Sequence, residues 1–194
     1  PLVWSALYKI LKNTGPHEYS YRFLICPENI GSAAFLHHSK KKVKDIIAGF
    51  VINCVGYGKE FTYKKSRRGN SISDFAAENV LKNSKNPYKI IDFVPEGSDE
   101  RQFCSPGFNL PIGLLMRKMF GEYKEYHTSL DNEDLINFDT IISTIKAYYE
   151  VLLTIESNFI PFGKIQFGTP QLSKSKVNLY KDIMDFGSEG KGER

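Results

Sequence analysis

Four polar side chains in three separate loops have the chemistry needed for hydrolysis. Glu28 directly follows an apolar stretch, Asp99 and Arg101 lie among Gly and Pro residues, and His127 stands between tyrosines and carboxylates. A neutral imidazole can bind a divalent ion, and a carboxylate can take a proton from the water that such an ion activates. If the fold brings the three loops together, these residue types suit a hydrolytic metal site.

Each of these residues also has an ordinary structural role open to it. Glu28 could cap the helix that follows, because the N-terminal end of a helix favours an anion. His127 could be a loop histidine bonded to a nearby carbonyl, and Asp99 with Arg101 could form an ion pair that fastens a loop. On residue types alone, these structural roles are the more frequent ones.

Helix-like and strand-like patterns alternate along the chain. Apolar residues at three-and-four spacing predict helices, and short apolar runs rich in β-branched and aromatic residues predict strands. Strands that alternate with helices favour an α/β fold, a three-layer α/β/α sandwich with a mostly parallel central sheet. The predicted helices cover 2–12, 29–38, 71–83 and 136–158, and the predicted strands cover 19–26, 45–55 (central), 61–66 (more exposed), 88–94 and 112–118.

In such a sheet, functional residues gather at the carboxyl ends of the strands. The loops 26–32, 96–113 and 121–132 each follow a predicted strand and carry the four candidate residues. The sequence therefore predicts one site at one edge of the sheet.

Composition narrows the classes of protein. The 194 residues suit one domain, and the net charge of +4 comes with two short basic runs, 37–44 and 63–70, expected to be solvated loops. Nucleic-acid binding is therefore not expected. Three widely spaced cysteines indicate neither a disulfide framework nor a zinc ribbon, and they fit a reducing cytoplasm. No apolar run reaches membrane length, and the first residues lack the features of a signal peptide.

Longer stretches of the sequence resemble a known family. The stretches "YRFLICPENIGSAAFL", "GSDERQFCSPGFNLPIGLLMR", "GEYKEYHTSLDN" and "GTPQLSK" closely resemble a bacterial aminopeptidase-like family, long catalogued as a domain of unknown function. That family is related to the zinc exopeptidases that remove single N-terminal residues, and more distantly to the glutaminyl cyclases. The resemblance implies a zinc-exopeptidase-like fold over nearly the whole chain.

The resemblance assigns roles to residues of the first loop. Where the wider clan has a glutamate pair, base first and metal ligand second, this chain has Glu28 and Asn29, so Glu28 is the implied general base. In an alternative register Glu28 is the ligand and Pro27 takes the place of the base. A further metal-binding aspartate of the clan falls near Asn53 or Cys54, so that ligand is lost.

The other two loops receive roles in the same way. The stretch "GSDERQF" is similar to a substrate-side loop of the clan, with Asp99 kept and Glu100 in place of a histidine. The resemblance implies that Asp99 and Arg101 shape the substrate side. His127 corresponds to the last metal-binding histidine of the clan.

Other parts of the site are expected upstream. Family members carry a further histidine and aspartate before a helix like the one at 2–12, together with an inserted β-rich domain upstream and a winged-helix domain downstream. We expect residues 1–186 to be the C-terminal part of an aminopeptidase-like domain and 187–194 to be a disordered tail. The resemblance implies one zinc ion in the longer protein, with part of its site in this chain.

Three functions follow, in order of preference. The first is a zinc-dependent aminopeptidase-like hydrolase that cleaves an amide bond of a small peptide or amino-acyl substrate. The alternative is a catalytically silent binding module for amino-acid or amino-sugar ligands, motivated by the asparagines at 29 and 53. The third is a regulator that senses ligands for an attached winged helix. No membrane partner is expected, and an oligomer is left open.

Overall fold

The computed structural model describes residues 1–159 and 167–168, and helices alternate with strands through most of them. The predicted alternation of elements is therefore confirmed, with shorter strands than expected. In chain order the elements are α1 (Leu2–Thr14), α2 (Ile30–Ser39), the 3-10 helix η1 (Lys42–Asp45), β1 (Gly49–Val51), β2 (Phe61–Lys64), α3 (Ile72–Asn83), β3 (Tyr88–Ile91), α4 (Glu100–Phe103), β4 (Ile112–Met116), the 3-10 helix η2 (Glu133–Leu135) and α5 (Phe138–Glu156).

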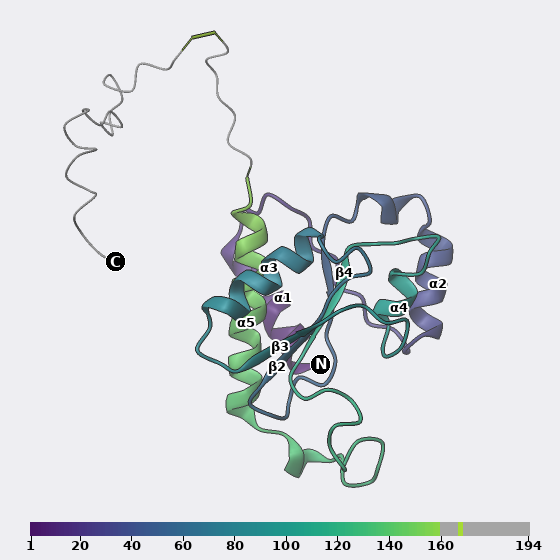
Figure 1. Ribbon diagram of the computed structural model, residues 1–194, viewed down its shortest axis with the longest axis vertical. Coiled ribbons are helices and arrows are strands. Elements are labelled where there is room, and N and C mark those ends of the chain that lie inside the picture. Colours follow the sequence, from purple (N-terminus) through teal and green to yellow (C-terminus); the bar gives the residue numbers. More distant parts are fainter. Residues whose placement is uncertain (160–166, 169–194) are drawn as a thin grey trace, which may run out of the picture. The chain divides into compact units, whose positions relative to one another are not determined.

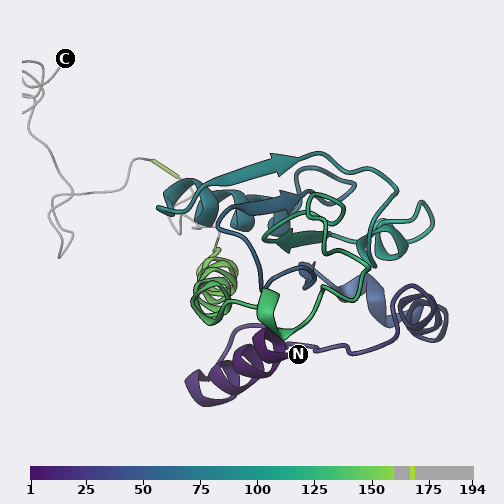
Figure 2. The ribbon, with the colours of Figure 1, turned by 90° about the horizontal axis from the view of Figure 1, so that it is seen from below.

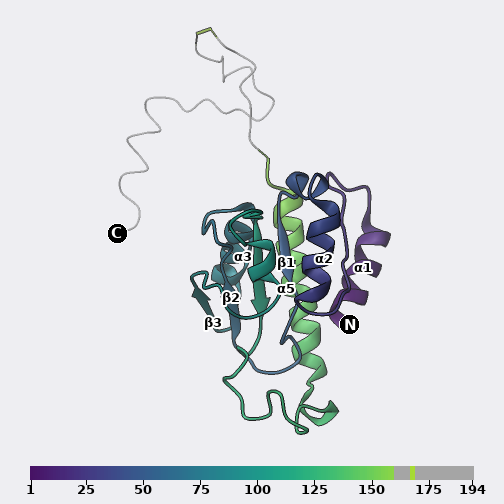
Figure 3. The ribbon, with the colours of Figure 1, turned by 90° about the vertical axis from the view of Figure 1, so that its right-hand side faces the viewer.

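The four described strands form one open sheet in the order β1-β4-β2-β3. Strand β1 pairs with β4 in parallel, β2 pairs with β3 in parallel, and β2 and β4 are antiparallel. Two of the three pairings are thus parallel, which confirms a mostly parallel sheet. Figure 3 shows β3 and β2 toward one side and β1 toward the other.

Helices cover both faces of the sheet and make three layers. In Figure 1 α1, α3 and α5 lie on one side of the strands, and α2 and α4 lie on the other. Figure 2 shows α5 (green) and α1 (purple) one beneath the other on the same face. Phe50, Tyr63 and Leu115 pack toward α1, α3 and α5, whereas Val51 and Ile112 pack toward α2 and α4.

Three of the predicted strands differ from what the sequence suggested. Residues 19–26 form no strand, because their aromatic side chains cover α1 instead: the ring of Phe23 packs edge-on against Trp4 and Tyr8, at centroid distances of 5.2 Å and 5.6 Å. The apolar run at 45–55 was expected to be central, but β1 keeps only three residues of it and lies at the edge of the described sheet.

The stretch expected to be exposed is instead fully buried where it forms β2. All four residues of β2 are buried, because β2 lies between β4 and β3. Its lysine, Lys64, escapes the cost of burying a lone charge because its Nζ lies 2.8 Å from Glu100 Oε1. A buried partner from a distant loop thus overrides the local polar pattern.

Helix α3 begins at a capping box. Ser71 accepts a hydrogen bond from the Asp74 backbone N–H, and the Asp74 carboxylate accepts one from the Ser71 backbone N–H. The same carboxylate also accepts hydrogen bonds from Ser66 and from the Tyr63 hydroxyl, so it ties β2 and the β2–α3 loop to the helix. Burial would raise the pKa of Asp74, but the hydrogen bonds from Ser66 and Ser71 outweigh it and hold that pKa below its usual value.

We expect Asp74→Asn to lower the free energy of unfolding by about 1–3 kcal/mol at pH 7, because buried donors lose their charged acceptor. Since the folded pKa of Asp74 is depressed, this stabilisation is present above the unfolded pKa of about 3.9 and is lost as pH falls through the folded value. Urea unfolding of both proteins between pH 3 and 7 measures the difference. A difference that stays constant down to the lowest pH would contradict the assignment.

Several sequence predictions lie partly or wholly outside the described residues. The domain limit at 186, the disordered tail at 187–194 and most of the "GTPQLSK" stretch cannot be compared with the structure. Within the described part, no helix is both long and apolar enough to cross a membrane.

Candidate functional site

The loops that follow β1, β3 and β4 meet at the carboxyl ends of β1 and β4. The Arg117 backbone N–H donates to the carbonyl of Cys54 at 2.9 Å, which joins the ends of the two parallel strands. The Asn53 side-chain amide donates to Ser98 Oγ at 3.2 Å, which brings in the loop after β3. The long green segment at the foot of Figure 1 is the loop after β4, which carries His127.

Glu28 belongs to the same neighbourhood. Burial raises the pKa of Tyr126, and the negative charges of Cys54, Glu28 and Asp131 raise it further. Burial also raises the pKa of Cys54, where the carboxylates of Asp131 and Glu28 act against a hydrogen bond with Tyr123 that lowers it. Glu28 is exposed, and the neighbouring Asn29 donates its backbone N–H to Asp99, which places Glu28 beside the loop after β3.

Asp99 holds the turn that presents Glu28. Its Oδ1 accepts hydrogen bonds from the Asn29 backbone N–H at 2.7 Å and from Ser32 Oγ at 2.6 Å. Asn29 has a φ of 62°, in the left-handed region that a non-glycine residue enters only with support from its surroundings. Asp99 supplies that support, at the start of α2.

Arg101 contacts the side chain of the same asparagine. Arg101 Nε donates to Asn29 Oδ1 at 3.1 Å, and the Gln102 side chain donates to the same oxygen at 3.3 Å. Asp99 Oδ2 and the terminal nitrogens of Arg101 have no hydrogen bond within the described residues, and both side chains are half-buried. Asp99 and Arg101 do not pair with each other there; each retains polar atoms that can bind a ligand.

His127 is exposed and held in an unusual backbone conformation. Its φ is 58°, and its ring stacks on Tyr126 with centroids 4.0 Å apart and planes 16° apart. Asn29, Cys54 and His127 are three of the four non-glycine residues with positive φ in the part of the chain that is described. Strained residues of this kind concentrate at functional sites, and three of them lie in the loops that meet here.

The described residues do not by themselves fit a zinc ion. No group of three or more His, Cys, Asp or Glu side chains able to hold a metal ion exists within residues 1–159 and 167–168. A catalytic zinc site normally has three protein ligands. His127 is thus at most one ligand of such an ion among the described residues.

A buried ion pair anchors the loop that carries Asp99. Lys64 Nζ lies 2.8 Å from Glu100 Oε1, both side chains are fully buried, and Lys64 also donates to the Glu96 carbonyl. Gly97 adopts a φ of 107°, and a Cβ there would lie 2.8 Å from Glu100 Oε1 and 2.7 Å from the Phe120 ring. The loop therefore fits only with glycine at position 97 and with its partner lysine in β2.

Sequence reasoning missed several of these residues. Lys64 belongs to the stretch 61–66, which the sequence predicts to be an exposed strand, and its polar neighbours give no signal of a buried partner. Tyr123 and Tyr126 both precede His127 in the sequence, and their rings pack edge to face with centroids 5.5 Å apart. Two tyrosines within four residues before a histidine were the available signal for this wall of the site.

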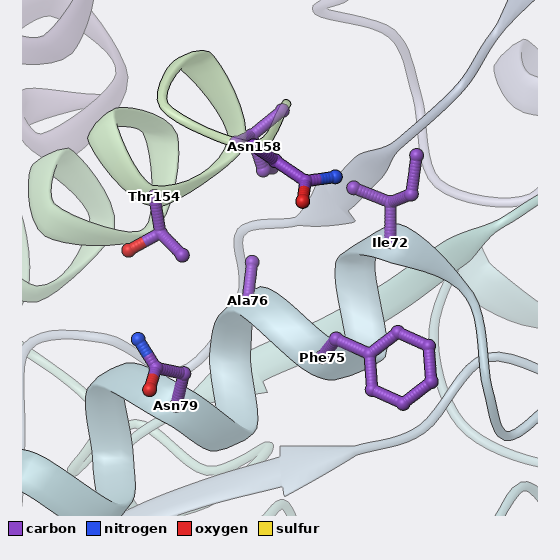
Figure 4. A pocket seen from close by; sticks show the side chains of 7 residues that line it. Ile72, Phe75, Ala76, Asn79, Thr154 and Asn158 are labelled. Atoms are coloured by element: carbon purple, nitrogen blue, oxygen red, sulfur yellow. The ribbon is translucent and has the colours of Figure 1, made fainter. Parts of the chain in front are cut away.

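A separate hollow of about 280 Å³ lies between α3 and α5. Figure 4 shows Ile72, Phe75 and Asn79 of α3 across from Thr154 and Asn158. No titratable side chain lines this hollow, and none of the four candidate residues reaches it. It is not a continuation of the candidate site.

Comparison with known proteins identifies the family. A family model described as "Domain of unknown function (DUF4910)" matches residues 1–158. The chain belongs to this family. A Clostridium acetobutylicum protein is 44% identical to this chain over 160 residues, which are 82% of this chain and 37% of the relative. Its provisional name describes a polysaccharide biosynthesis protein with an aminopeptidase-like domain. The aminopeptidase-like resemblance is thus confirmed.

Solved structures place this family among aminopeptidase folds. A Clostridium acetobutylicum crystal structure, named provisionally as a peptidase, is 43% identical with a TM-score of 0.77 and covers 80% of this chain and 36% of that one. A zinc aminopeptidase from Bacillus subtilis shares the fold at 16% identity and a TM-score of 0.66, over 77% of this chain and 39% of that one. The chain spans little more than a third of the length of these relatives.

Proposed function

We propose that this chain contributes part of the active site of an aminopeptidase-like hydrolase that cleaves an amide bond. The observation that carries the proposal is that hydrogen bonds join the loops of Glu28, of Asp99 and Arg101, and of His127 at one sheet edge. The relatives that are 43–44% identical bear peptidase or aminopeptidase-like names, which supports the same class of chemistry.

Glu28 is the proposed general base. Its carboxylate takes a proton from the attacking water and later returns it to the leaving amine, as general acid–base catalysis requires. Glu28 lies just before α2, next to the turn at Asn29. The Asn29 backbone N–H donates to Asp99 Oδ1 at 2.7 Å, and this hydrogen bond fixes the turn. An exposed carboxylate next to a fixed turn is accessible to both water and substrate.

Asp99 and Arg101 are proposed to bind the polar end of the substrate. Asp99 Oδ2 suits the α-amino group of a peptide or amino-acyl compound, and the terminal nitrogens of Arg101 suit a carboxylate. Because their other atoms are bound to Asn29, both side chains are already ordered before the substrate arrives. Ordering in advance lowers the entropic cost of binding.

His127 is proposed as a single ligand of a zinc ion. Since the described residues supply no group of three ligands, the remaining ones would come from residues outside the described part. If bound, zinc would supply Lewis acidity to the reaction. The exposed imidazole, fixed by its stack on Tyr126, is accessible to such an ion.

We expect the protein purified without chelator to hold about one zinc per molecule, and His127→Ala to lose it. Elemental mass spectrometry of both proteins measures the content. His17→Ala is the matched control, because its ring hydrogen-bonds the Leu11 carbonyl at 2.8 Å, away from the site. If both variants retain the metal, His127 is not a ligand. If none of the proteins holds metal, the hypothesis of a zinc-dependent reaction is wrong.

A binding module for amino-acid or amino-sugar ligands is the second proposal. It is favoured by the asparagines at 29 and 53 and by the absence of a three-ligand group within the described residues. Such a module would bind amino-acyl ligands through Asp99 and Arg101 without turnover. Calorimetry together with an amide-cleavage assay separates the two proposals, because binding without cleavage favours the module.

A further inference from the structure

Two basic stretches that are far apart in the sequence meet around one pocket. Lys40 and Lys44 come from the run at 37–44, and Arg68 comes from the run at 63–70. The pocket measures about 570 Å³, within the range of about 300–1,000 Å³ that is typical of small-molecule sites. Taken as separate loops both runs would be solvated, but the fold gathers three of their cations around one hollow.

The pocket combines this charge with an apolar floor. Val43 and Leu110 are buried in the core between the sheet and α2, and Ile46 and Phe108 are half-buried against the same core. An aromatic ring that is partly exposed in a hollow can receive a flat apolar group. The lining therefore has an apolar base and a cationic rim.

The positive charge of the rim is not neutralised within the described part of the chain. None of Lys40, Lys44 and Arg68 has a carboxylate within 4.0 Å there, and no Asp or Glu lines the pocket. Arg68 Nε donates to the Asn109 carbonyl at 2.7 Å, which orients the guanidinium. Unpaired cations around a concave surface concentrate the field and attract anions.

This pocket lies away from the candidate active site. Ile46 precedes β1, and Leu110 precedes β4, so the pocket is at the amino ends of the two parallel strands. Glu28 and His127 belong to loops near their carboxyl ends. In Figure 1 η1, which contains Val43 and Lys44, and the loop after β4 lie at opposite ends of the strands.

We propose that the pocket binds a small organic anion that joins a phosphate or diphosphate to a flat apolar group, as a nucleoside diphosphate does. The guanidinium of Arg68 offers the two-pronged donor geometry that suits phosphate oxygens, and Lys40 and Lys44 add charge. Phe108 offers its ring to the flat group. This site is additional to the hydrolase proposal and does not depend on it.

A nucleic acid strand is the competing ligand, and the lining favours the small molecule. A strand needs a basic groove that follows its backbone, with successive aromatic platforms. Here three cations enclose one hollow with a single ring, and the net charge of the whole chain is only +4. The experiment includes an oligonucleotide so that both ligands are compared.

The test measures binding of adenosine diphosphate, inorganic pyrophosphate and adenosine by isothermal titration calorimetry. Adenosine diphosphate should bind most tightly, pyrophosphate at least fivefold more weakly, and adenosine not measurably, because only the first satisfies both halves of the pocket. Affinity should fall as salt increases. No binding of adenosine diphosphate at millimolar concentration overturns the proposal.

Variants locate the binding. The double variant Lys44→Gln with Arg68→Gln should weaken adenosine diphosphate at least tenfold, and the control Lys9→Gln with Lys146→Gln, which removes equal charge from exposed positions on α1 and α5, should change it less than twofold. Phe108→Leu keeps the apolar packing and should weaken binding through the lost ring. If the control variant loses as much affinity for adenosine diphosphate as the double variant does, the proposed site is wrong. The proposal is also wrong if a single-stranded oligonucleotide binds more tightly than adenosine diphosphate and the double variant abolishes that binding.

Discussion

Glu28→Gln is expected to lower kcat for amide cleavage by about 10²–10⁴-fold, with a much smaller change in KM, because general-base catalysis contributes about this much. Glutamine keeps the size of the side chain but cannot accept a proton at neutral pH. The exposed position of Glu28 means that the substitution leaves the core unchanged. Turnover of chromogenic amino-acyl anilides by the longer protein measures the effect.

The control for this prediction is Glu150→Gln, an exposed carboxylate on α5, which should stay within twofold of the parent. Zinc content, measured in parallel, separates the two registers that the family resemblance leaves open. Loss of turnover with metal retained identifies Glu28 as the base, and loss of both identifies it as a ligand. Unchanged turnover would remove Glu28 from the mechanism.

Lys64→Met is expected to lower the free energy of unfolding by about 3–5 kcal/mol, because it leaves the Glu100 carboxylate buried without its counter-ion. Both side chains are fully buried. Lys64 binds Glu100 Oε1, and Glu100 Oε2 has no hydrogen-bond partner among the described residues. The same substitution frees the Glu96 carbonyl and so loosens the loop that positions Asp99. Urea unfolding followed by circular dichroism measures the loss.

Two further variants make this prediction specific. Lys82→Met removes a partly exposed helical ion pair with Glu78 and should cost no more than about 1 kcal/mol. Lys64→Met combined with Glu100→Leu removes both buried charges and should recover much of the lost stability. If the double variant is as unstable as Lys64→Met alone, unpaired charge is not the cause of the loss.

The same buried pair shows why the site could be predicted only in part. The sequence named Glu28, Asp99, Arg101 and His127 as candidates. It correctly placed the loops after β3 and β4 behind strands, but the stretch before Glu28 forms no strand. It could not give the partners of these residues. The hydrogen bond from the Asn29 backbone N–H to Asp99 spans 70 residues, and the pair of Lys64 with Glu100 spans 36. The catalytic and metal-binding roles of these residues stay predictions.

The sequence by itself determined the features that depend on neighbours along the chain. The spacing of apolar residues predicts α1, α3 and α5 within a few residues, because the hydrogen bonds of a helix join residues four apart. The alternation of elements also predicts the three-layer class, since parallel strands need a crossover connection.

Only the tertiary structure decided what depends on contacts between distant residues. Residues 19–26 have the composition of a strand but cover α1, and the polar stretch at 61–66 lies at the centre of the sheet, because a strand exists only where it has a partner. Residues of the two basic runs line one pocket because the tertiary fold brings these distant segments together. Sheet pairing and buried charge pairs join residues across the whole chain, so their choice belongs to the fold and not to the local pattern.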